Sequence, residues 1–177
     1  MTRRQLTFCL TALGALSAVA GCAADGVGGY SIASLYREGV ETVAVPIWTR
    51  DADIFRRDLE LRLTEAVIKR IEADTPYRVA PRTEADTLLT GRIVQVTQQV
   101  LSFDPDTGRP RQLQVQLVVA YTWTDLRTGE KLVTVPRFAS SGVYTPPDPF
   151  DEDFFLGSAT AIDEVALRVV ESMEQPW

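Results

Sequence analysis

The sequence predicts an α+β fold: a mixed, mostly antiparallel sheet of four to five strands with two helices packed on one face. Two observations lead to this prediction. The middle of the chain alternates apolar and polar residues over long runs separated by turn residues, which is typical of antiparallel hairpins. A segment with helical spacing of its apolar residues stands on each side of these runs. The expected order is therefore a strand, a helix, four strands and a helix.

The first predicted strand covers residues 41–48. Its apolar side chains alternate along one side at Val43, Val45 and Ile47. Pro46 has no N–H to donate to a neighbouring strand, so we expect this strand to lie at an edge or to end in a bulge.

The first predicted helix begins at an Asp53 cap, runs to about Ala73 and stops at Thr75–Pro76. Its apolar residues form two stripes, one of Phe55, Leu59, Leu63 and Ala66 and the other of Leu61, Ile68 and Ile71. The polar edge that remains is narrow: Asp58, Arg62, Glu65, Lys69 and Glu72. Such a helix should be covered on two sides. The sheet supplies one cover, and a second helix, which we favour, or a partner protein supplies the other.

The remaining strands are predicted to pair as hairpins. After a short extended piece at 77–79, a long strand covers 85–103, with Gly91 as a bulge and with Val94, Val96 and Val100 on one face. A turn at 104–110 leads into a strand at 111–125. One face of that strand is apolar throughout: Leu113, Val115, Leu117, Val119, Tyr121 and Trp123.

The C-terminal part should add one strand and one helix. The strand covers 132–144, where Pro136 marks an edge or a break. A loop at 145–153 precedes a helix over 154–173. One face of this helix is predicted to be buried: Ser158, Ile162, Val165, Val169 and Met173.

The long hairpin has an uncharged polar face, made by Gln95, Thr97, Gln99, Gln112, Gln114 and Gln116. Solvent-facing sheet surfaces more often carry lysine and glutamate. A neutral hydrogen-bonding face would suit contact with the polar interior wall of a larger barrel, or with sugars. An ordinary solvent face is the other interpretation.

Composition excludes several kinds of chemistry. The chain has no histidine, which excludes Ser–His and Cys–His catalysis and His-ligated metals. The motif at Asp104, Asp106 and Gly108 begins like a calcium loop but lacks its continuation, so we interpret it as a turn. We therefore predict no catalytic residue, no metal site and no cofactor.

An acidic cluster precedes the last helix: Asp148, Asp151, Glu152 and Asp153. Paired carboxylates could perform acid–base catalysis. Negative charge also stabilises the N-terminus of a helix, and we favour that role. The formal net charge of −6 argues against nucleic acid as a partner.

The N-terminus resembles a bacterial lipoprotein signal. Arg3 and Arg4 precede an uncharged apolar run at 6–20, and small residues then lead to Cys22. The run is shorter than the ~20 residues of an ordinary membrane span. We predict a signal peptide over 1–21 and acylation of Cys22, with a flexible tether over 22–30. A single domain would cover 31–177.

The ordered set of these features resembles the LptE family of lipopolysaccharide-assembly lipoproteins. The resemblance begins at Gly21–Cys22 and continues through "TVAVPIWTR" (42–50), "LELRLTEAVIKRI" (59–71) and "ADTLLTGRIVQV" (85–96). It covers most of the chain that follows Cys22, to about Ala120, and the later elements agree in order.

This resemblance implies a non-enzymatic lipoprotein at the periplasmic face of the outer membrane. Such a protein would be a plug and assembly partner of an LptD-type β-barrel and would contact lipopolysaccharide. Some family members bind lipopolysaccharide through basic residues in loops at one end of the sheet, and one such position falls on the tip of the long hairpin, where Arg109 and Arg111 stand here. The loop before the last helix, a second such place, is acidic in this chain. That departure leaves the plug role intact.

Two other functions stay open at this point. One is an accessory scaffold lipoprotein of another envelope or secretion assembly. The other is a carboxylate-dependent envelope hydrolase, which would need two carboxylates that converge in a cleft.

Overall fold

The computed structural model describes residues 35–51, 53–54, 58–146 and 154–175. They all lie within one compact unit, Ser34–Trp177. The predicted signal, Cys22, its tether and the acidic cluster at 148–153 lie outside the described residues.

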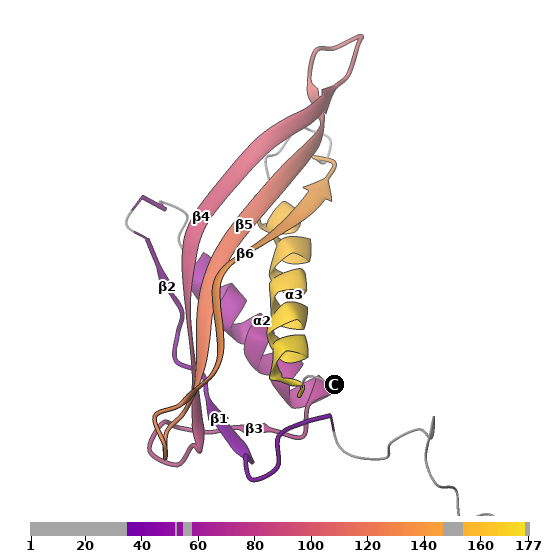
Figure 1. The fold of residues 1–177 in the computed structure, drawn as a ribbon. Helices are drawn as coiled ribbons and strands as arrows, with labels where there is room; N and C mark the ends of the chain where they lie inside the picture. The colour runs from indigo at the N-terminus through magenta and orange to yellow at the C-terminus, as the bar shows by residue number, and fades with distance from the viewer. Residues whose placement is uncertain (1–34, 52, 55–57, 147–153, 176–177) are drawn as a thin grey trace, which may run out of the picture. The chain divides into compact units, whose positions relative to one another are not determined.

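The described residues form one mixed sheet of six strands, one more than the upper limit predicted (Figure 1). Its order is β3-β1-β4-β5-β6, and β2 also pairs with β4. The strands are β1 (Thr42–Ala44), β2 (Thr49–Arg50), β3 (Arg78–Val79), β4 (Thr87–Phe103), β5 (Pro110–Asp125) and β6 (Lys131–Tyr144). The three long strands are antiparallel, whereas β1 and β2 run parallel to β4. The predicted fold class is confirmed.

Two helices, α2 (Leu59–Asp74) and α3 (Phe154–Met173), lie on one face of this sheet (Figure 1). The predicted buried face of α3 is confirmed at all five positions, and so is the apolar face of β5 at all six. Helix α3 lies against α2, so a second helix provides the additional cover predicted for α2. The cover is incomplete, because Leu61 on the second stripe is 47% exposed.

Helix α2 begins later than predicted. Asp53 does not cap it; Asp58 holds the N-cap position, with φ of 66° and no hydrogen bond from its side chain to the helix. The chain is still in the sheet at Arg50, so it needs several residues to cross to the helical layer before it can coil.

Pro46 separates two short strands in place of the single strand predicted for 41–48. β1 ends at Ala44, and the alternation breaks there: Ile47 is 60% exposed, whereas the next residue, Trp48, is buried. β1 itself lies between β3 and β4, so it is not an edge strand.

Gly91 has a different role from the predicted bulge. The extra residue of β4 is Val94, since the register shifts between Ile93 and Gln95. Gly91 instead lies under the indole of Trp48, and a Cβ at this position would overlap the ring. The missing side chain therefore makes room for the indole.

Pro136 has the position that was predicted for it. It lies in β6, at the far edge of the sheet, where the register with β5 shifts between Val119 and Tyr121. Farther along β6, the Oγ of Ser140 donates to the carbonyl of Ala161 at 2.9 Å and so ties the strand to α3.

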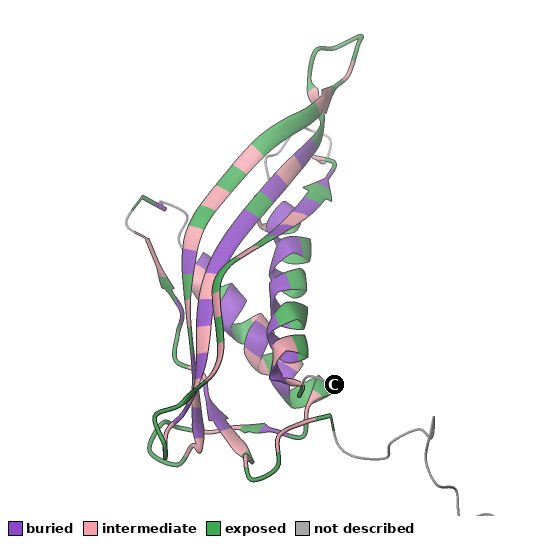
Figure 2. Cartoon of the chain, in the orientation of Figure 1, coloured by how far each residue is buried: buried purple, intermediate pink, exposed green. Residues whose placement is uncertain are grey.

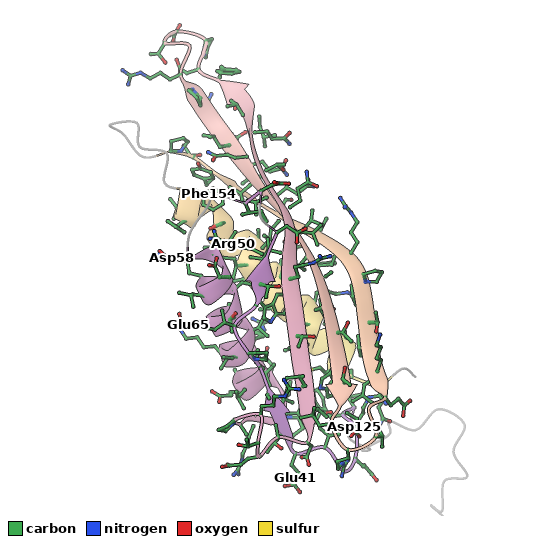
Figure 3. The ribbon with its side chains drawn as sticks, turned by 90° about the vertical axis from the view of Figure 1, so that its left-hand side faces the viewer. Glu41, Arg50, Asp58, Glu65, Asp125 and Phe154 are labelled. Carbon is green, nitrogen blue, oxygen red and sulfur yellow. The ribbon has the colours of Figure 1, made fainter. Side chains whose placement is uncertain are left out.

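Asp86 joins β1 to the start of β4. Its carboxylate accepts hydrogen bonds from the N–H of Glu41 (3.0 Å), the N–H of Thr42 (3.0 Å) and the hydroxyl of Thr42 (2.9 Å). The bond from the Glu41 N–H, followed by those from Thr42, lowers the pKa of the Asp86 carboxyl below its usual value. Figure 3 shows Glu41 and Asp125 at this same end of the sheet.

Gly91→Ala should lower the free energy of unfolding by about 2 kcal/mol, because the new methyl group must displace the buried indole of Trp48. Chemical denaturation monitored by tryptophan fluorescence measures this change. Thr90→Ala, at the exposed neighbouring position, should change the stability by less than about 0.5 kcal/mol. Equal stability of the Gly91→Ala variant and the native protein would show that the indole does not need this space.

Asp86→Asn should destabilise the protein by about 1 kcal/mol at pH 7, because an amide oxygen accepts the same bonds without charge. The folded-state pKa of Asp86 is lowered, so its contribution is present above the unfolded-state pKa and is lost as the pH falls through the folded-state value. The difference between native protein and variant should therefore shrink from pH 7 to pH 3 in urea denaturation. Asp163→Asn, at an exposed position on α3, is the control. A difference that stays constant with pH would contradict this role.

Candidate functional site

The face of the sheet turned away from the helices carries the predicted polar residues. Thr97 lies directly opposite Gln116, and Gln99 lies opposite Gln114, across β4 and β5. Gln99 donates from Nε2 to Oε1 of Gln114 at 2.6 Å. Farther toward the turn, the hydroxyl of Ser102 donates to Oε1 of Gln112 at 3.4 Å. Two side-chain hydrogen bonds, one between amides and one from a hydroxyl to an amide, thus link the two strands on this face.

The structure places four of the six residues predicted for this face directly opposite one another, and it places Gln112 opposite Ser102. Gln95 differs, since the bulge at Val94 places it opposite Val118. Gln114 is half-buried and the other five polar side chains are exposed. Figure 2 shows the alternation of exposed and half-buried residues along the upper part of β4.

No charged residue interrupts this surface. The stretches 95–102 of β4 and 112–120 of β5 contain none, although the whole chain has a formal net charge of −6. The residues of β6 that lie opposite Val118, Gln116 and Gln114 are also uncharged: Ala139, Ser141 and Val143. We call the outward surface formed by these parts of the three strands, residues 95–102, residues 112–120 and the three β6 residues just named, the neutral face.

A shallow hollow of about 300 Å³ adjoins the neutral face toward the other end of the strands. Gly91 and Ala120 provide part of its lining, and four threonines contribute to it: Thr49, Thr90, Thr122 and Thr134. Arg92 at the hollow is 3.4 Å from the carboxylate of Asp51. The sequence pattern did not reveal this hollow, because its lining comes from β2, β4, β5 and β6 together.

The tip of the long hairpin is an ordered turn, as predicted. The carboxylate of Asp104 accepts hydrogen bonds from the N–H of Asp106 (3.1 Å), the N–H of Thr107 (2.8 Å) and the hydroxyl of Thr107 (2.9 Å). The Thr107 bonds are the main cause of the lowered pKa of Asp104. Gly108 has φ of 68°, which a glycine adopts without strain. The Asp104 carboxylate is thereby engaged by the turn itself.

The two predicted lipopolysaccharide-contact residues, Arg109 and Arg111, are exposed beside this turn. Two apolar side chains on the opposite strand are exposed as well, Leu101 by 48% and Phe103 by 61%. The hairpin continues beyond β6, whose last registered residue, Tyr144, lies opposite Leu113 (Figure 1). The tip therefore combines cations with apolar surface.

A groove of about 450 Å³ between α2 and α3 was not predicted. Small residues on both helices contribute to it, namely Ala66, Ala73, Ala159 and Ala166. At its side, the guanidinium of Arg62 lies 4.2 Å from the ring centre of Phe155, a cation–π contact. The available signal in the sequence was the presence of alanines at exposed or half-buried positions of both helices, Ala66, Ala73 and Ala159.

Among the described residues, no three side chains of histidine, cysteine, aspartate or glutamate gather as a metal site would require. Neither helix in the described part of the chain is both long enough and apolar enough to cross a membrane.

Several solved structures resemble this one at low sequence identity. A hypothetical protein from Chlamydia trachomatis is 9% identical, with a TM-score of 0.49 over 75% of this chain and 98% of that chain. Uncharacterized lipoprotein B from Nitrosomonas europaea is 15% identical, with a TM-score of 0.46 over 81% and 88%. Rare lipoprotein B from Shewanella oneidensis is 15% identical, with a TM-score of 0.44 over 75% and 93%. No functional conclusion rests on likenesses this weak.

The sequence itself identifies the family. No curated protein matches the chain. The family model described as "LptE: Lipopolysaccharide-assembly" matches residues 40–174, from just before β1 to just after α3. That span includes every strand and helix described above, together with the neutral face and the hairpin tip. The chain therefore belongs to the LptE family of lipopolysaccharide-assembly proteins.

Proposed function

We propose that this protein is a non-enzymatic lipoprotein that acts as a plug and assembly partner of an LptD-type β-barrel. It would serve the transport of lipopolysaccharide and its insertion into the outer membrane. The neutral face is the observation that carries this proposal, and membership of the LptE family supports it.

The physical argument concerns the cost of removing charges from water. A wide membrane barrel has a polar interior, so a plug must meet a wall of hydrogen-bonding groups. Burying an ion without a partner costs several kcal/mol, whereas amides and hydroxyls can exchange water for polar groups of the wall at little cost. The stretches 95–102 and 112–120 offer such groups without charge. Helices cover the other face of the sheet, which supports our assignment of the barrel contact to the neutral face.

The anchor in this proposal is Cys22. Removal of residues 1–21 would leave its thiol at the new N-terminus for acylation, with residues 22–30 as tether and 31–177 as the domain. Several acyl chains hold a protein firmly at a membrane, since each buried CH₂ contributes about 0.8 kcal/mol. The domain would then lie on the periplasmic side of the outer membrane.

The hairpin tip is the proposed contact with lipopolysaccharide. Arg109 and Arg111 provide cations for phosphate groups, and Leu101 and Phe103 provide exposed apolar surface for acyl chains. The Asp104 turn holds the tip in shape before a ligand arrives, which lowers the entropic cost of binding.

The first experiment identifies the partner. The full-length protein, tagged at its C-terminus and expressed in its own cell, is extracted from membranes with mild detergent, and co-purifying proteins are identified by mass spectrometry. A large outer-membrane barrel should be recovered in stoichiometric amount. Cys22→Ala should abolish membrane attachment. Recovery of a different envelope complex, or of no partner, would overturn the plug function and favour the scaffold alternative.

Two lysine variants in the same experiment test which face meets the barrel. Gln116→Lys adds a charge to the neutral face and should lower barrel recovery roughly tenfold or more. Ala73→Lys adds the same charge to the groove of the helical layer and should leave recovery unchanged. The reverse result would assign the barrel contact to the helices.

Replacing Arg109 and Arg111 together with glutamine should weaken binding to vesicles that contain lipopolysaccharide by roughly thirtyfold, since each cation near an anionic surface contributes about 1 kcal/mol. Co-sedimentation measures the binding, with phosphatidylcholine vesicles as the blank. The matched control replaces Arg78 and Arg82, which are also exposed but lie in and after β3. Equal losses of vesicle binding in the two double variants would show that the overall charge of the protein, and not the hairpin tip, determines binding.

A further inference from the structure

We infer that the outer part of the β4 edge is a docking site for one additional strand, supplied by an extended, uncharged segment of a partner protein. This inference does not depend on the identity of that partner. It rests on two differences. β4 is paired along its whole length on one side but only in part on the other, and the β6 edge of the sheet carries features that hinder strand addition whereas the outer part of β4 does not.

On one side, β4 pairs with β5 along its whole length, from Thr87 to Phe103. On the other side, β1 registers with Thr87 and Leu88, and β2 registers with Arg92 and Ile93. Beyond Ile93, no strand in the described part of the chain registers with β4 on this side. We call residues 95–103 on this side the outer β4 edge.

The chain cannot extend β2 along this edge, because it turns away at once. The N–H of Asp51 donates to the carbonyl of Ile93 at 3.0 Å and makes the last bond of the pairing. The N–H of Ile54 then donates to the carbonyl of Asp51 at 3.1 Å, which closes a turn toward α2. In the described part of the chain, β2 therefore does not continue as a strand along residues 95–103.

The backbone alternation identifies groups that face the outer β4 edge. The carbonyl of Ile93 points to the β2 side, since it accepts the bond from Asp51. Val94 is the extra residue of the bulge, so alternation resumes one residue later. The N–H and C=O groups of Val96 and Val100 therefore point toward this side as well.

The far edge of the sheet, at β6, is protected against strand addition, whereas the outer β4 edge is not. β6 carries Pro136, which has no N–H, and the charged residues Lys131 and Arg137. Its Ser141 N–H is capped by the carboxylate of Glu164 from α3 at 3.3 Å. The segment "QVTQQVLSF" (95–103) contains no charge, no proline and no glycine.

These features define the occupant. Main-chain groups spaced along a strand are satisfied by another extended chain, as in recognition by strand addition. No charged residue lies between Gln95 and Phe103, so a charged segment would lose hydration without gaining an ion pair. Val100, 39% exposed, and Phe103, 61% exposed, would gain apolar cover from the added strand.

A second copy of this chain fits less well. In an antiparallel pair of two β4 edges, the hairpin of each copy would continue past Ile93 of the other. That place is already taken by β2. A single extended segment meets no such obstacle.

Photo-crosslinking of the full-length protein in its membranes tests the geometry. A photoreactive amino acid replaces Gln95, Thr97 or Gln99 in turn, and the adducts are mapped by mass spectrometry. Strand addition predicts adducts on one short partner segment that move by about two residues for each step of two along β4. Gln116, one strand inward, should not give this progression. Adducts to β4 of another copy, or adducts scattered without register, would overturn the inference.

The variants Val100→Pro and Val100→Ala together test whether the main-chain N–H of residue 100 donates a hydrogen bond to the added strand. Both variants lose the valine side chain, but only proline removes the N–H that faces the outer edge. With the photoreactive residue at Thr97, Val100→Pro should lower the adduct yield about tenfold, and Val100→Ala should lower it less than about twofold. Equal melting temperatures of the two variants establish that both are folded. Equal adduct yields would overturn the inference.

Discussion

The attachment of the helical layer to the sheet depends on the contacts of Trp48. The indole of Trp48 lies on Gly91 of β4, and its ring centre is 6.1 Å from that of Tyr121 on β5. The main-chain N–H of the same residue donates to the hydroxyl of Thr64 on α2 at 3.0 Å. One residue thus fixes the chain between β1 and β2 against both the sheet and a helix. This arrangement holds α2 over one face and leaves the opposite face open.

Where neighbouring residues along the chain determined the structure, the sequence was sufficient to predict it. The apolar face of β5 and the buried face of α3 follow from simple periodicity, because each element is long and has one covered side. The region from Pro46 to Asp58 was predicted less well. There Trp48, the β2 pairing and the start of α2 depend on partners far along the chain, such as Gly91 and Ile93. Local pattern carries no information about such partners.

The candidate surfaces also include some that the sequence predicts and some that it does not. Alternation placed Thr97, Gln99, Gln114 and Gln116 together, because residues two apart share a face of a strand. The groove between α2 and α3 and the hollow beside Gly91 arise from elements that meet only in the folded protein. The Asp86 contacts with Glu41 and Thr42 are equally non-local. A single sequence gives no register between such segments.

The absence of ionisable groups from residues 95–102 and 112–120 has a consequence for the conditions under which this surface can work. At the proposed location, the periplasmic side of the outer membrane, small ions exchange with the medium, so acidity and salt content vary with the surroundings of the cell. A contact made by amides and hydroxyls neither gains nor loses protons over that range, and dissolved salt does not screen it. A barrel bound through the neutral face, as proposed above, would therefore be held with similar affinity at low and at high ionic strength. The arginines of the hairpin tip are sensitive to ionic strength, so the two regions would respond separately to one change of environment.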